Sequence, residues 1–521
     1  MRYILDSMQM KQVDEISIKK IGIPSMVLME RAALCVAEFI ENMFTKKTRI
    51  LCVCGGGNNG ADGIAAGRIL FEKGYDVTVW LEGKGTQECE NQISIAKKSG
   101  VKLKNYTRSN NTVIPEEFDI IIDAVFGIGL SRDVEGSFAQ IIKAINDSKA
   151  VVVSVDIPSG INATTGQIMG DAVKADHTVT FGYKKTGIMI FPGAEHSGTV
   201  KVADIGFPKA AEIKIPKKAF TFTQKDLKCI PKRKKNTNKG QYGKVLVIAG
   251  SETMGGAACL AGLSAYRSGA GLVKVLTHTD NRNAVLKAVP EALITTYDST
   301  FDRDKIEKMI SAEFEWASCI IIGPGLSKSE TAIAMTENVI RNAYVPVIID
   351  ADALNIVADL IKDPERTAGV FRDNNAAALI FTPHIGEMER LSGTDKDIIK
   401  ADPVRHAEHF VKDFMKKYAV CNEVICVMKD ARTIVTGLSG GTYINGSGNS
   451  GMAKGGSGDV LTGVIAGLIV NGMSCFDASC MGVYIHGLAG DLGASDKGEY
   501  GMKAGDIIDN ICEVMKHGQG R

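Results

Sequence analysis

Short apolar, β-branched runs alternate along this chain with longer segments in which apolar residues recur every three or four positions. In the first part of the chain, the apolar runs predict strands at residues 49–54, 76–81, 119–124, 150–155 and 177–181. Segments 62–73 and 136–146 have helical periodicity and a length that suits crossover connections. Because the predicted strands are apolar throughout, we expect a parallel sheet that helices cover on both faces.

The pattern lapses in a lysine-rich segment near residues 208–240 and then begins again. Further apolar runs predict strands at 244–249, 272–277, 319–323, 345–349, 378–382 and 424–428, again in a largely parallel sheet. The basic run at 232–235 suits a solvated connector better than a binding site in a protein of balanced charge. The two series share no repeated sequence, so we predict two different α/β domains, 1–215 and 239–521, with a linker at 216–238.

Composition narrows the classes of partner. Among 521 residues, 61 basic side chains balance 60 acidic ones, so no overall field attracts nucleic acid or an anionic membrane. The most apolar late segment, 460–470, is shorter than the roughly 20 residues needed to span a bilayer, and the charged N-terminus does not suit a signal peptide. Several of the 12 cysteines lie inside apolar runs, as buried thiols of a reducing compartment do. We therefore expect a cytoplasmic protein without nucleic-acid or membrane partners.

A glycine-rich segment, residues 54–63, follows the first predicted strand of this series and leads into a helix. Its glycine spacing fits G-x-G-x-x-G, and Glu82 ends the next strand, where an acid that binds ribose would lie. A Rossmann dehydrogenase is therefore one interpretation. Another is a tight strand-to-helix turn in which Asn and Gly take positive φ. However, Asn58, Asn59 and Asp62 add polar side chains that a bare pyrophosphate loop does not need.

Two more predicted strands end in groups that suit a ligand site. Asp123 closes one strand and precedes the loop 127–133, and Asp156 closes another and is followed by Pro158, Ser159 and glycine. Ligands bind beyond the carboxyl ends of strands in open parallel sheets, so the three loops can share one site. One such acid could be only a helix N-cap, but three converging loops favour a binding site.

These segments, with Leu-Met-Glu-Arg-Ala at 28–32 and Lys185-x-Gly187, resemble the NAD(P)H-hydrate epimerase family, the YjeF N-terminal domain. The resemblance implies a Rossmann-like three-layer sandwich that binds hydrated NADH or NADPH, with a potassium ion held by Asn59, Asp123 and Ser159. It assigns substrate contacts to Asn58, Asn59, Gly60, Ala61, Asp62, Gly127, Ile128, Gly129, Leu130, Ser131, Arg132, Asp133 and Asp156. Ala61 stands where the family usually has glycine, and its methyl group would narrow the loop.

Epimerisation at C6 of the hydrated nicotinamide ring needs reversible loss of the C6 hydroxyl, with help from the ring nitrogen and from a group that exchanges a proton. Asp156 is the candidate for that exchange. Its alternative role is to orient the ring or the ribose.

The second half contains a glycine-rich segment at residues 449–459 that runs directly into the apolar helix predicted at 460–470. Amides at a helix N-terminus bind anions, and the helix dipole adds to the attraction, so phosphate is expected there. Asp459 ends the segment and is either a catalytic base or a simple N-cap. The Gly-x-Gly-Asp turn resembles the ribokinase-like superfamily, and no Walker motif occurs, so a vitamin or sugar kinase is a second interpretation.

Further segments of this half resemble the ADP/ATP-dependent NAD(P)H-hydrate dehydratase family. They lie at residues 239–243, 254–258, 323–326, 350–355 and 382–388. The resemblance implies a ribokinase-like α/β domain in which Ala257, Gly325, His384 and Asp459 contact the hydrate. It implies ADP, with Mg²⁺, bound by Lys429, Asp430, Ala431, Arg432, Thr433, Asn449, Gly455, Gly456 and Gly458. Asp459 would take the proton of the C6 hydroxyl, which the nucleotide's phosphate activates as a leaving group. Asp430, Arg432 and Ile385 depart from the family pattern.

Together these observations predict a bifunctional enzyme of nicotinamide dinucleotide repair. It would epimerise the R and S forms of NADH or NADPH hydrate and dehydrate the S form at the expense of ADP. The alternatives are a ribokinase-like small-molecule kinase with an accessory domain, and a protein whose N-terminal half is only a regulatory dinucleotide-binding module. We expect small-molecule partners and a homo-oligomer.

Overall fold

The computed structural model describes residues 1–106, 114, 116–216, 218–372, 374–418 and 422–518. The chain divides into two compact units, which are described separately below. The N-terminal unit is Tyr3–Ala219, and the C-terminal unit comprises Met1–Arg2 and Phe220–Arg521.

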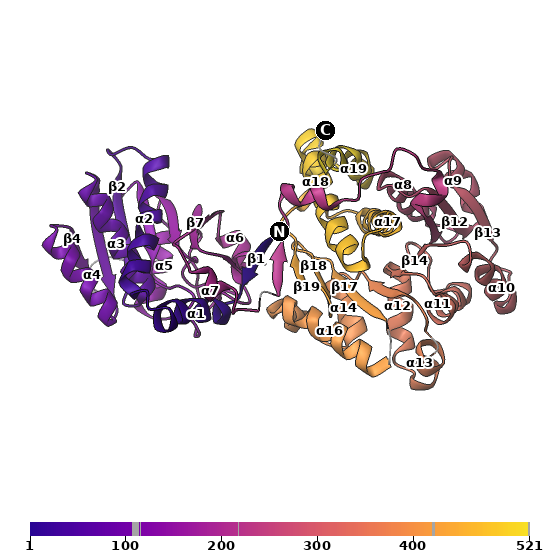
Figure 1. Cartoon of the computed structure of the whole chain (residues 1–521), viewed down its shortest axis with the longest axis horizontal. Coiled ribbons are helices and arrows are strands. Elements are labelled where there is room, and N and C mark those ends of the chain that lie inside the picture. The colour runs from indigo at the N-terminus through magenta and orange to yellow at the C-terminus, as the bar shows by residue number, and fades with distance from the viewer. Residues whose placement is uncertain (107–113, 115, 217, 373, 419–421, 519–521) are drawn as a thin grey trace. The chain divides into compact units, whose positions relative to one another are not determined.

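The N-terminal unit is built on a seven-stranded sheet in the order β4-β3-β2-β5-β6-β7-β9 (Figure 1). Every neighbouring pair in this sheet is parallel. The strands are β2 (Arg49–Gly55), β3 (Asp76–Glu82), β4 (Lys102–Asn105), β5 (Ile120–Ala124), β6 (Val151–Val155), β7 (His177–Phe181) and β9 (Thr199–Ala203). Because all strands run the same way, the carboxyl ends of β2, β5 and β6 meet at one edge.

Alternate residues of these strands enter two different cores. Ile50, Cys52 and Cys54 of β2 pack with helices α2 (Ser25–Met43), α3 (Asn58–Glu72) and α4 (Gln87–Lys98) on one face. Leu51 and Val53 pack with α5 (Ser137–Asn146) on the other. The period-two alternation of a strand thus gives the sheet two apolar faces, each covered by helices, which confirms the predicted three-layer α/β sandwich.

Several short elements surround this sheet. Strand β1 (Arg2–Leu5) pairs in parallel with β8 (Lys184–Lys185), and helix α1 (Ser7–Glu15) follows it. Asp6 and Gln9 form a capping box at the start of α1, and a π-helical turn (Ile16–Lys20) continues the helix. A 3-10 turn (Thr186–Ile188) and the short helices α6 (Gly193–His196) and α7 (Lys209–Glu212) lie further along the chain.

The C-terminal unit has a larger sheet, in which β13-β12-β11-β14-β15-β16-β17 are parallel and β18 and β19 are antiparallel additions next to β17. The short strand β10 (Ala219–Thr221) follows β19 in the strand order. The other strands are β11 (Lys244–Ile248), β12 (Leu272–His278), β13 (Leu293–Tyr297), β14 (Cys319–Ile322), β15 (Val347–Ile349), β16 (Ala378–Phe381), β17 (Glu423–Met428), β18 (Ile434–Gly437) and β19 (Gly441–Ile444).

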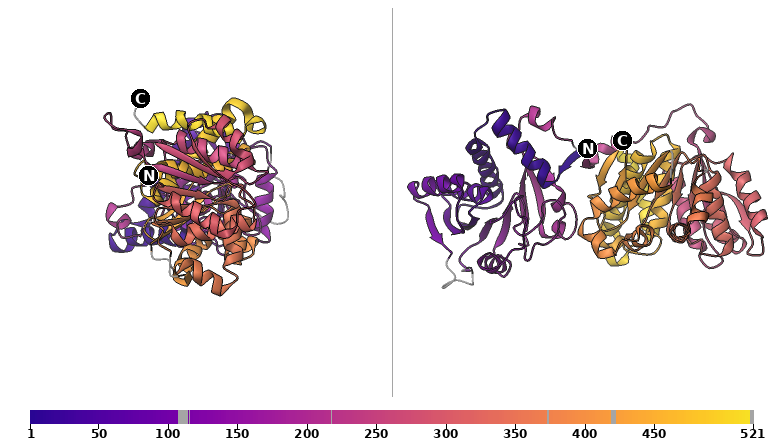
Figure 2. Two further views of the ribbon diagram at one scale, coloured as in Figure 1. Left: turned by 90° about the vertical axis from the view of Figure 1, so that its right-hand side faces the viewer. Right: turned by 90° about the horizontal axis from the view of Figure 1, so that it is seen from below.

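Helices also cover both faces of this sheet (Figure 2), which confirms the second predicted α/β domain. One face packs against α8 (Gly255–Arg267), α9 (Arg282–Ala288), α17 (Ser457–Val470), α18 (Cys475–Gly501) and α19 (Ala504–Gly518). The other packs against α10 (Arg303–Phe314), α11 (Glu330–Asn342), α12 (Ala351–Leu360), α13 (Pro364–Phe371), α14 (Ile385–Ser392), α15 (Lys396–Ala401) and α16 (Pro403–Tyr418).

The structure differs from the expected elements in two informative ways. Helix α3 begins four residues before the predicted 62, because the polar residues after the glycines already form its first turn. The expected linker, of which residue 217 lies outside the described residues, is also partly folded: Phe220, Leu227 and Ile230 are buried in the core of the C-terminal unit. Burial of these three side chains shortens the solvated connector. No helix in the described residues is long and apolar enough to span a bilayer.

Candidate active sites

The glycine-rich segment of the N-terminal unit forms the sharp passage from β2 into α3. A Cβ atom on Gly55 would lie 2.2 Å from the carbonyl oxygen of Val125, and one on Gly60 would lie 1.7 Å from that of Gly55. No glycine or asparagine in this segment has a positive φ, so the alternative interpretation as a turn with positive φ is wrong. Glycine is required here because neighbouring backbones approach too closely for any side chain.

Asn59, Asp123 and Ser159, predicted to share a potassium ion, do lie together. Ser159 Oγ donates to Asp123 Oδ1 at 2.5 Å, and Asn59 Nδ2 donates to the carbonyl oxygen of Phe126 at 3.1 Å. The Ser159 hydroxyl also contacts that carbonyl at 3.3 Å, so a backbone oxygen that the sequence did not single out joins the group. Burial raises the pKa of Asp123, although hydrogen bonds from Ser159, Ser154 and the Val125 amide oppose the shift.

Asp156 follows β6 in a left-handed conformation with φ 68°, which is rare for any residue other than glycine. Its Oδ1 accepts hydrogen bonds from Lys185 Nζ at 2.5 Å, from the Phe181 amide at 3.0 Å and from Thr180 Oγ1 at 3.2 Å. Lys185 is fully buried, and its ammonium also donates to Thr180 Oγ1 and to the Phe181 carbonyl. The ion pair therefore fixes Asp156 in its strained conformation.

The other predicted substrate contacts fall into two groups. Asn58, Gly129, Ser131, Arg132 and Asp133 are exposed on the loops beside this edge, and Gly60, Asp62, Gly127, Ile128 and Leu130 are partly or fully buried. The methyl group of Ala61 is fully buried in the core between α3 and the sheet. The expectation that it narrows the loop is therefore wrong, because the first helical turn points this side chain inward.

Sequence reasoning assigned no role to two buried charged residues at this site. Lys185 was noted only as part of a family segment, and Asp14 was not noted at all. Burial and repulsion by Asp156 raise the pKa of Asp14 to about 6, while attraction by Lys185 opposes the shift. Asp14 lies on the α1 face that also carries the buried Met10 and Val13. The sequence signal that could have identified Asp14 is a carboxylate on the apolar face of an amphipathic helix.

In the C-terminal unit, Asp459 lies in the first turn of α17 but does not cap the helix. The N-cap is Gly456, in the left-handed conformation with φ 92°, and it makes no side-chain capping bond. Burial, reinforced by repulsion from Asp350 and opposed by attraction to Lys429, raises the pKa of Asp459 to about 6. The simple N-cap interpretation is therefore wrong.

Beside Asp459 lies a buried polar cluster that the sequence analysis named only in part. Asp350 Oδ1 accepts from Lys429 Nζ and from Thr382 Oγ1, each at 2.6 Å, and Glu387 Oε2 is 4.0 Å from the same ammonium. Burial alone would lower the pKa of Lys429, but attraction to Asp350, Glu387 and Asp459 raises it overall. The three carboxyl groups thus favour the charged form of the Lys429 ammonium that lies among them.

His384 N-caps α14 through Nδ1, which accepts from the amides of Gly386 and Glu387 at 3.0 and 3.3 Å. Its side chain is 54% exposed and its pKa is lowered by burial and by the charges of Lys429 and Arg390, which favours a neutral ring open to solvent. A parallel bridge joins His384 to Lys429. The predicted hydrate contact therefore stands next to the cluster.

Ala257 and Gly325 also lie together, because a Cβ atom on Gly325 would be 3.0 Å from Cβ of Ala257. Gly325 has φ 56°, and its carbonyl oxygen accepts from the Ser251 amide at 2.6 Å. The start of α8 and the end of β14 are thus joined at this edge of the sheet.

The predicted ADP segments come from two places. Residues 429–433 form the turn between the antiparallel strands β17 and β18. Asn449 caps the turn before α17 and donates to Asp491 Oδ1 at 3.0 Å, so its amide is already used within the protein. A Cβ atom on Gly458 would lie 3.3 Å from Lys429 Nζ, which brings the glycine-rich turn and Lys429 into one site.

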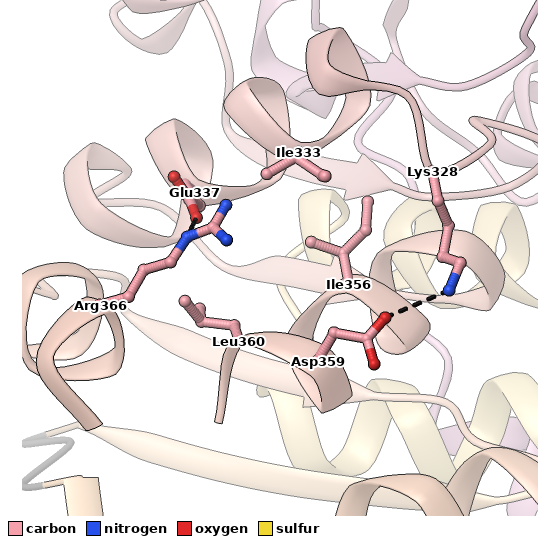
Figure 3. A pocket seen from close by; sticks show the side chains of 7 residues that line it. All are labelled: Lys328, Ile333, Glu337, Ile356, Asp359, Leu360 and Arg366. Atoms are coloured by element: carbon pink, nitrogen blue, oxygen red, sulfur yellow. Dashed lines mark hydrogen bonds and ion pairs between the residues drawn. The ribbon is translucent and has the colours of Figure 1, made fainter. Parts of the chain in front are cut away.

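A cavity of about 140 Å³ lies elsewhere and is lined by Ile356, Asp359 and Leu360 of α12, among others (Figure 3). Its charged walls are already paired: Glu337 binds Arg366 at 2.5 Å, and Asp359 binds Lys328 at 3.1 Å. Three aliphatic side chains complete the lining. The cavity therefore offers little unpaired polarity to a ligand. No set of three or more His, Cys, Asp or Glu side chains suited to a metal occurs among the described residues.

Two family models match the chain. One, described as YjeF-related protein N-terminus, covers residues 25–187, and the other, described as NAD(P)H-hydrate dehydratase, covers residues 245–513. The bifunctional NAD(P)H-hydrate repair enzyme of Moorella thermoacetica is 34% identical over 533 residues, which cover 99% of this chain and 97% of that enzyme. The chain belongs to this family. The corresponding enzyme of Escherichia coli K12 is 32% identical, over 95% of this chain and 90% of its own length.

Two solved structures resemble part of the chain. A ribokinase-like superfamily protein of Enterococcus faecalis covers 58% of this chain and 96% of its own, with 26% identity and a TM-score of 0.49. The ADP/ATP-dependent NAD(P)H-hydrate dehydratase of Bacillus subtilis, co-crystallised with ATP and Mg²⁺, covers 56% and 96%, with 28% identity and a TM-score of 0.47. Family membership confirms the predicted repair enzyme over the dehydrogenase and kinase interpretations.

Proposed function

We propose that the C-terminal unit dehydrates the S form of NADH or NADPH hydrate at the expense of ADP. One observation carries this proposal: Asp459 stands in the first turn of α17 without being its N-cap, and its carboxyl group interacts electrostatically with Asp350 and Lys429, which form an ion pair. Amides of the same first turn have no intrahelical partner and suit the phosphates of ADP. A base and an anion site therefore share one helix end.

In the proposed reaction, Asp459 accepts the proton of the C6 hydroxyl while that oxygen attacks the β-phosphorus of ADP, and AMP leaves. The C6–O bond then breaks as the C5 proton passes to the solvent, so phosphate departs and the dihydropyridine is restored. Lys429 would balance the negative charge that develops on the transferring phosphoryl group. Mg²⁺ is usually held by one or two carboxylates together with substrate phosphates, and Asp350 and Glu387 provide carboxylates of that kind.

For the N-terminal unit, we propose interconversion of the R and S hydrates at the edge that carries Asp156. Potassium would be held by Asn59, Asp123, Ser159 and the carbonyl oxygen of Phe126. The donor set fits, because all its ligating atoms are oxygens, which a hard cation prefers. The ion would fix the loops after β2, β5 and β6 at one point and so help to shape the pocket.

The test is incubation of the full chain with mixed hydrate epimers and ADP, while the dihydronicotinamide absorbance is followed. Reactions without protein, without nucleotide and with ATP serve as controls. We expect complete conversion, with AMP and phosphate formed in equal amounts to the restored dinucleotide. If the absorbance fails to return both with ADP and with ATP, the proposal is wrong. Consumption of one epimer alone would instead leave the N-terminal unit as a binding module.

We further propose a cytosolic homo-oligomer. Every cysteine that the structure describes is free, and many are buried, as expected in a reducing compartment. The oligomeric state is a prediction that light scattering on the purified chain can test.

A further inference from the structure

The epimerase site contains one more carboxyl group that is placed to take part in the reaction. Strand β1 pairs with β8 so that Leu5 lies opposite Lys185, and the Ser7 amide donates to Thr164 Oγ1 at 3.2 Å. These contacts hold the start of α1 beside the strand that carries Lys185. Asp14, one residue before the end of α1, is on the inner face of the helix with Val13.

Three carboxyl groups and one ammonium meet here, and their partners are unevenly shared. The three hydrogens of the Lys185 ammonium go to Asp156 Oδ1, Thr180 Oγ1 and the Phe181 carbonyl. Within the described part of the chain, no hydrogen bond or ion pair joins the side chains of Asp14 and Asp62 to the protein. Asp156 is therefore the carboxylate that is paired with the ammonium, while the other two are available to a ligand.

The two unpartnered acids differ in how easily they exchange a proton. Burial and repulsion by Asp156 raise the pKa of Asp14 to about 6, within reach of neutral pH. Burial, Asp156 and Asp14 together raise the pKa of Asp62 well above its ordinary value, which favours its protonated form. Lys185 lowers both but does not cancel the shifts. A general acid and base works best with a pKa near the working pH.

We propose that Asp14 is the residue that exchanges the proton with the C6 hydroxyl, and that Asp156, held by Lys185, positions the ring. This inference rests on the epimerase function proposed above. Of the two roles considered for Asp156, proton exchange and orientation of the ring or the ribose, it favours orientation.

The step balances without any further reactant. The Asp14 carboxylic acid protonates the C6 hydroxyl, the C6–O bond breaks as the N1 lone pair forms an N1=C6 iminium, and water leaves. Water then adds to the opposite face of C6 and returns its proton to the Asp14 carboxylate. The negative charge of Asp156 would stabilise the cationic ring between the two steps.

The test compares Asp14→Asn with Glu15→Gln in the full chain. Glu15 is the next residue of α1, is exposed, and pairs only with Lys19 in the described residues. Conversion of a single epimer is followed by chromatography without ADP, so the C-terminal unit cannot consume it, and the uncatalysed rate is subtracted. We expect Asp14→Asn to lower kcat by about 10²- to 10⁴-fold with little change in KM. Glu15→Gln should match the unaltered chain.

The pH profile separates a proton-exchanging role from a structural one. The unaltered chain needs protonated Asp14, so kcat/KM for epimerisation should fall as pH rises through about 6. Asp14→Asn should lose this fall in kcat/KM, the limb of the pH profile near 6. Asp14→Glu keeps the carboxyl group, so it should retain the limb while its rate of epimerisation is reduced. A normal rate in Asp14→Asn, or a limb that persists in it, would overturn the inference. So would an Asp14→Glu variant that folds but lacks the limb.

Failure of the underlying function gives a different result. If the unaltered chain does not epimerise at all, the proposed function is wrong and Asp14 has no reaction to serve. Dehydration of the S epimer with ADP, which takes place in the other unit, should be normal in every α1 variant and reports that the C-terminal unit is intact.

Discussion

Replacement of Asp459 by asparagine should make the C-terminal unit both less active and more stable. The amide has the same shape as the carboxylate but cannot accept the hydroxyl proton. Loss of a general base costs about 10²- to 10⁴-fold in rate, and we expect a decrease of that size in ADP-dependent dehydration. Epimerisation by the N-terminal unit should be unchanged.

The gain in stability follows from the raised pKa of Asp459. A shift from 3.8 to about 6 corresponds to at most about 3 kcal/mol, at about 1.4 kcal/mol per pH unit. Between these two values the folded protein binds more protons than the unfolded chain, so the unfolding free energy falls as pH rises. The destabilisation by the charged Asp459 carboxylate is absent below pH about 4 and complete above pH about 6. Asp459→Asn should therefore stabilise the protein at pH 8 and have almost no effect at pH 4.

Thermal unfolding of the full chain at several pH values, with dehydratase turnover measured on the same samples, tests both parts. Asp506→Asn is the matched control, since Asp506 also lies in the first turn of a helix but accepts a hydrogen bond from the Lys503 amide at 2.7 Å. That variant should keep full activity and gain no stability. If Asp459→Asn instead retains turnover, Asp459 is not the base. If the variant is destabilised at pH 8, the charge of Asp459 does not weaken the fold.

Three further changes test other parts of the two sites. Asp123→Ala should abolish the potassium dependence of epimerisation and leave dehydration intact; an unchanged potassium response in kinetic assays would show that the ion lies elsewhere. Gly60→Ala should lower the unfolding free energy by at least about 1–3 kcal/mol, because its Cβ would meet a carbonyl oxygen at 1.7 Å. Gly57→Ala is the control, since its Cβ would have no atom within 4 Å, and it should unfold in denaturant like the unaltered chain. Gly458→Ala places a methyl group 3.3 Å from Lys429 Nζ and should raise the KM for ADP about tenfold or more; an unaltered KM would place the nucleotide away from this turn.

Local pattern was enough to predict much of both folds. The strands at 49–54, 177–181 and 272–277 were expected within one residue of their observed bounds, because continuous apolar runs have few alternatives to a buried strand. The strands β4 and β9 were not expected, since they lie at the two edges of the sheet and carry exposed lysines. Edge strands of this kind lack the continuous apolar signal.

Helix starts were harder to predict than helix existence. The sequence suggested that Asp459 precedes its helix, but in the structure α17 begins at Ser457 because Gly456 adopts a left-handed conformation. Whether an acid caps a helix or stands inside its first turn depends on one φ angle. That difference changed the interpretation of Asp459 from a cap to an acid inside the first turn of the helix.

The sequence by itself determined that the chain has two parallel α/β domains, and that glycine-rich turns and acids follow their strands, because periodicity and turn chemistry are local properties. Only the tertiary structure decided which charges meet. Asp350 and Lys429 are separated by 79 positions, and Asp14 interacts electrostatically with Asp156, which lies on a distant part of the chain. Strand order and pairing bring such groups together, and burial then shifts their pKa values, so neither effect can be read from the neighbouring residues of either partner.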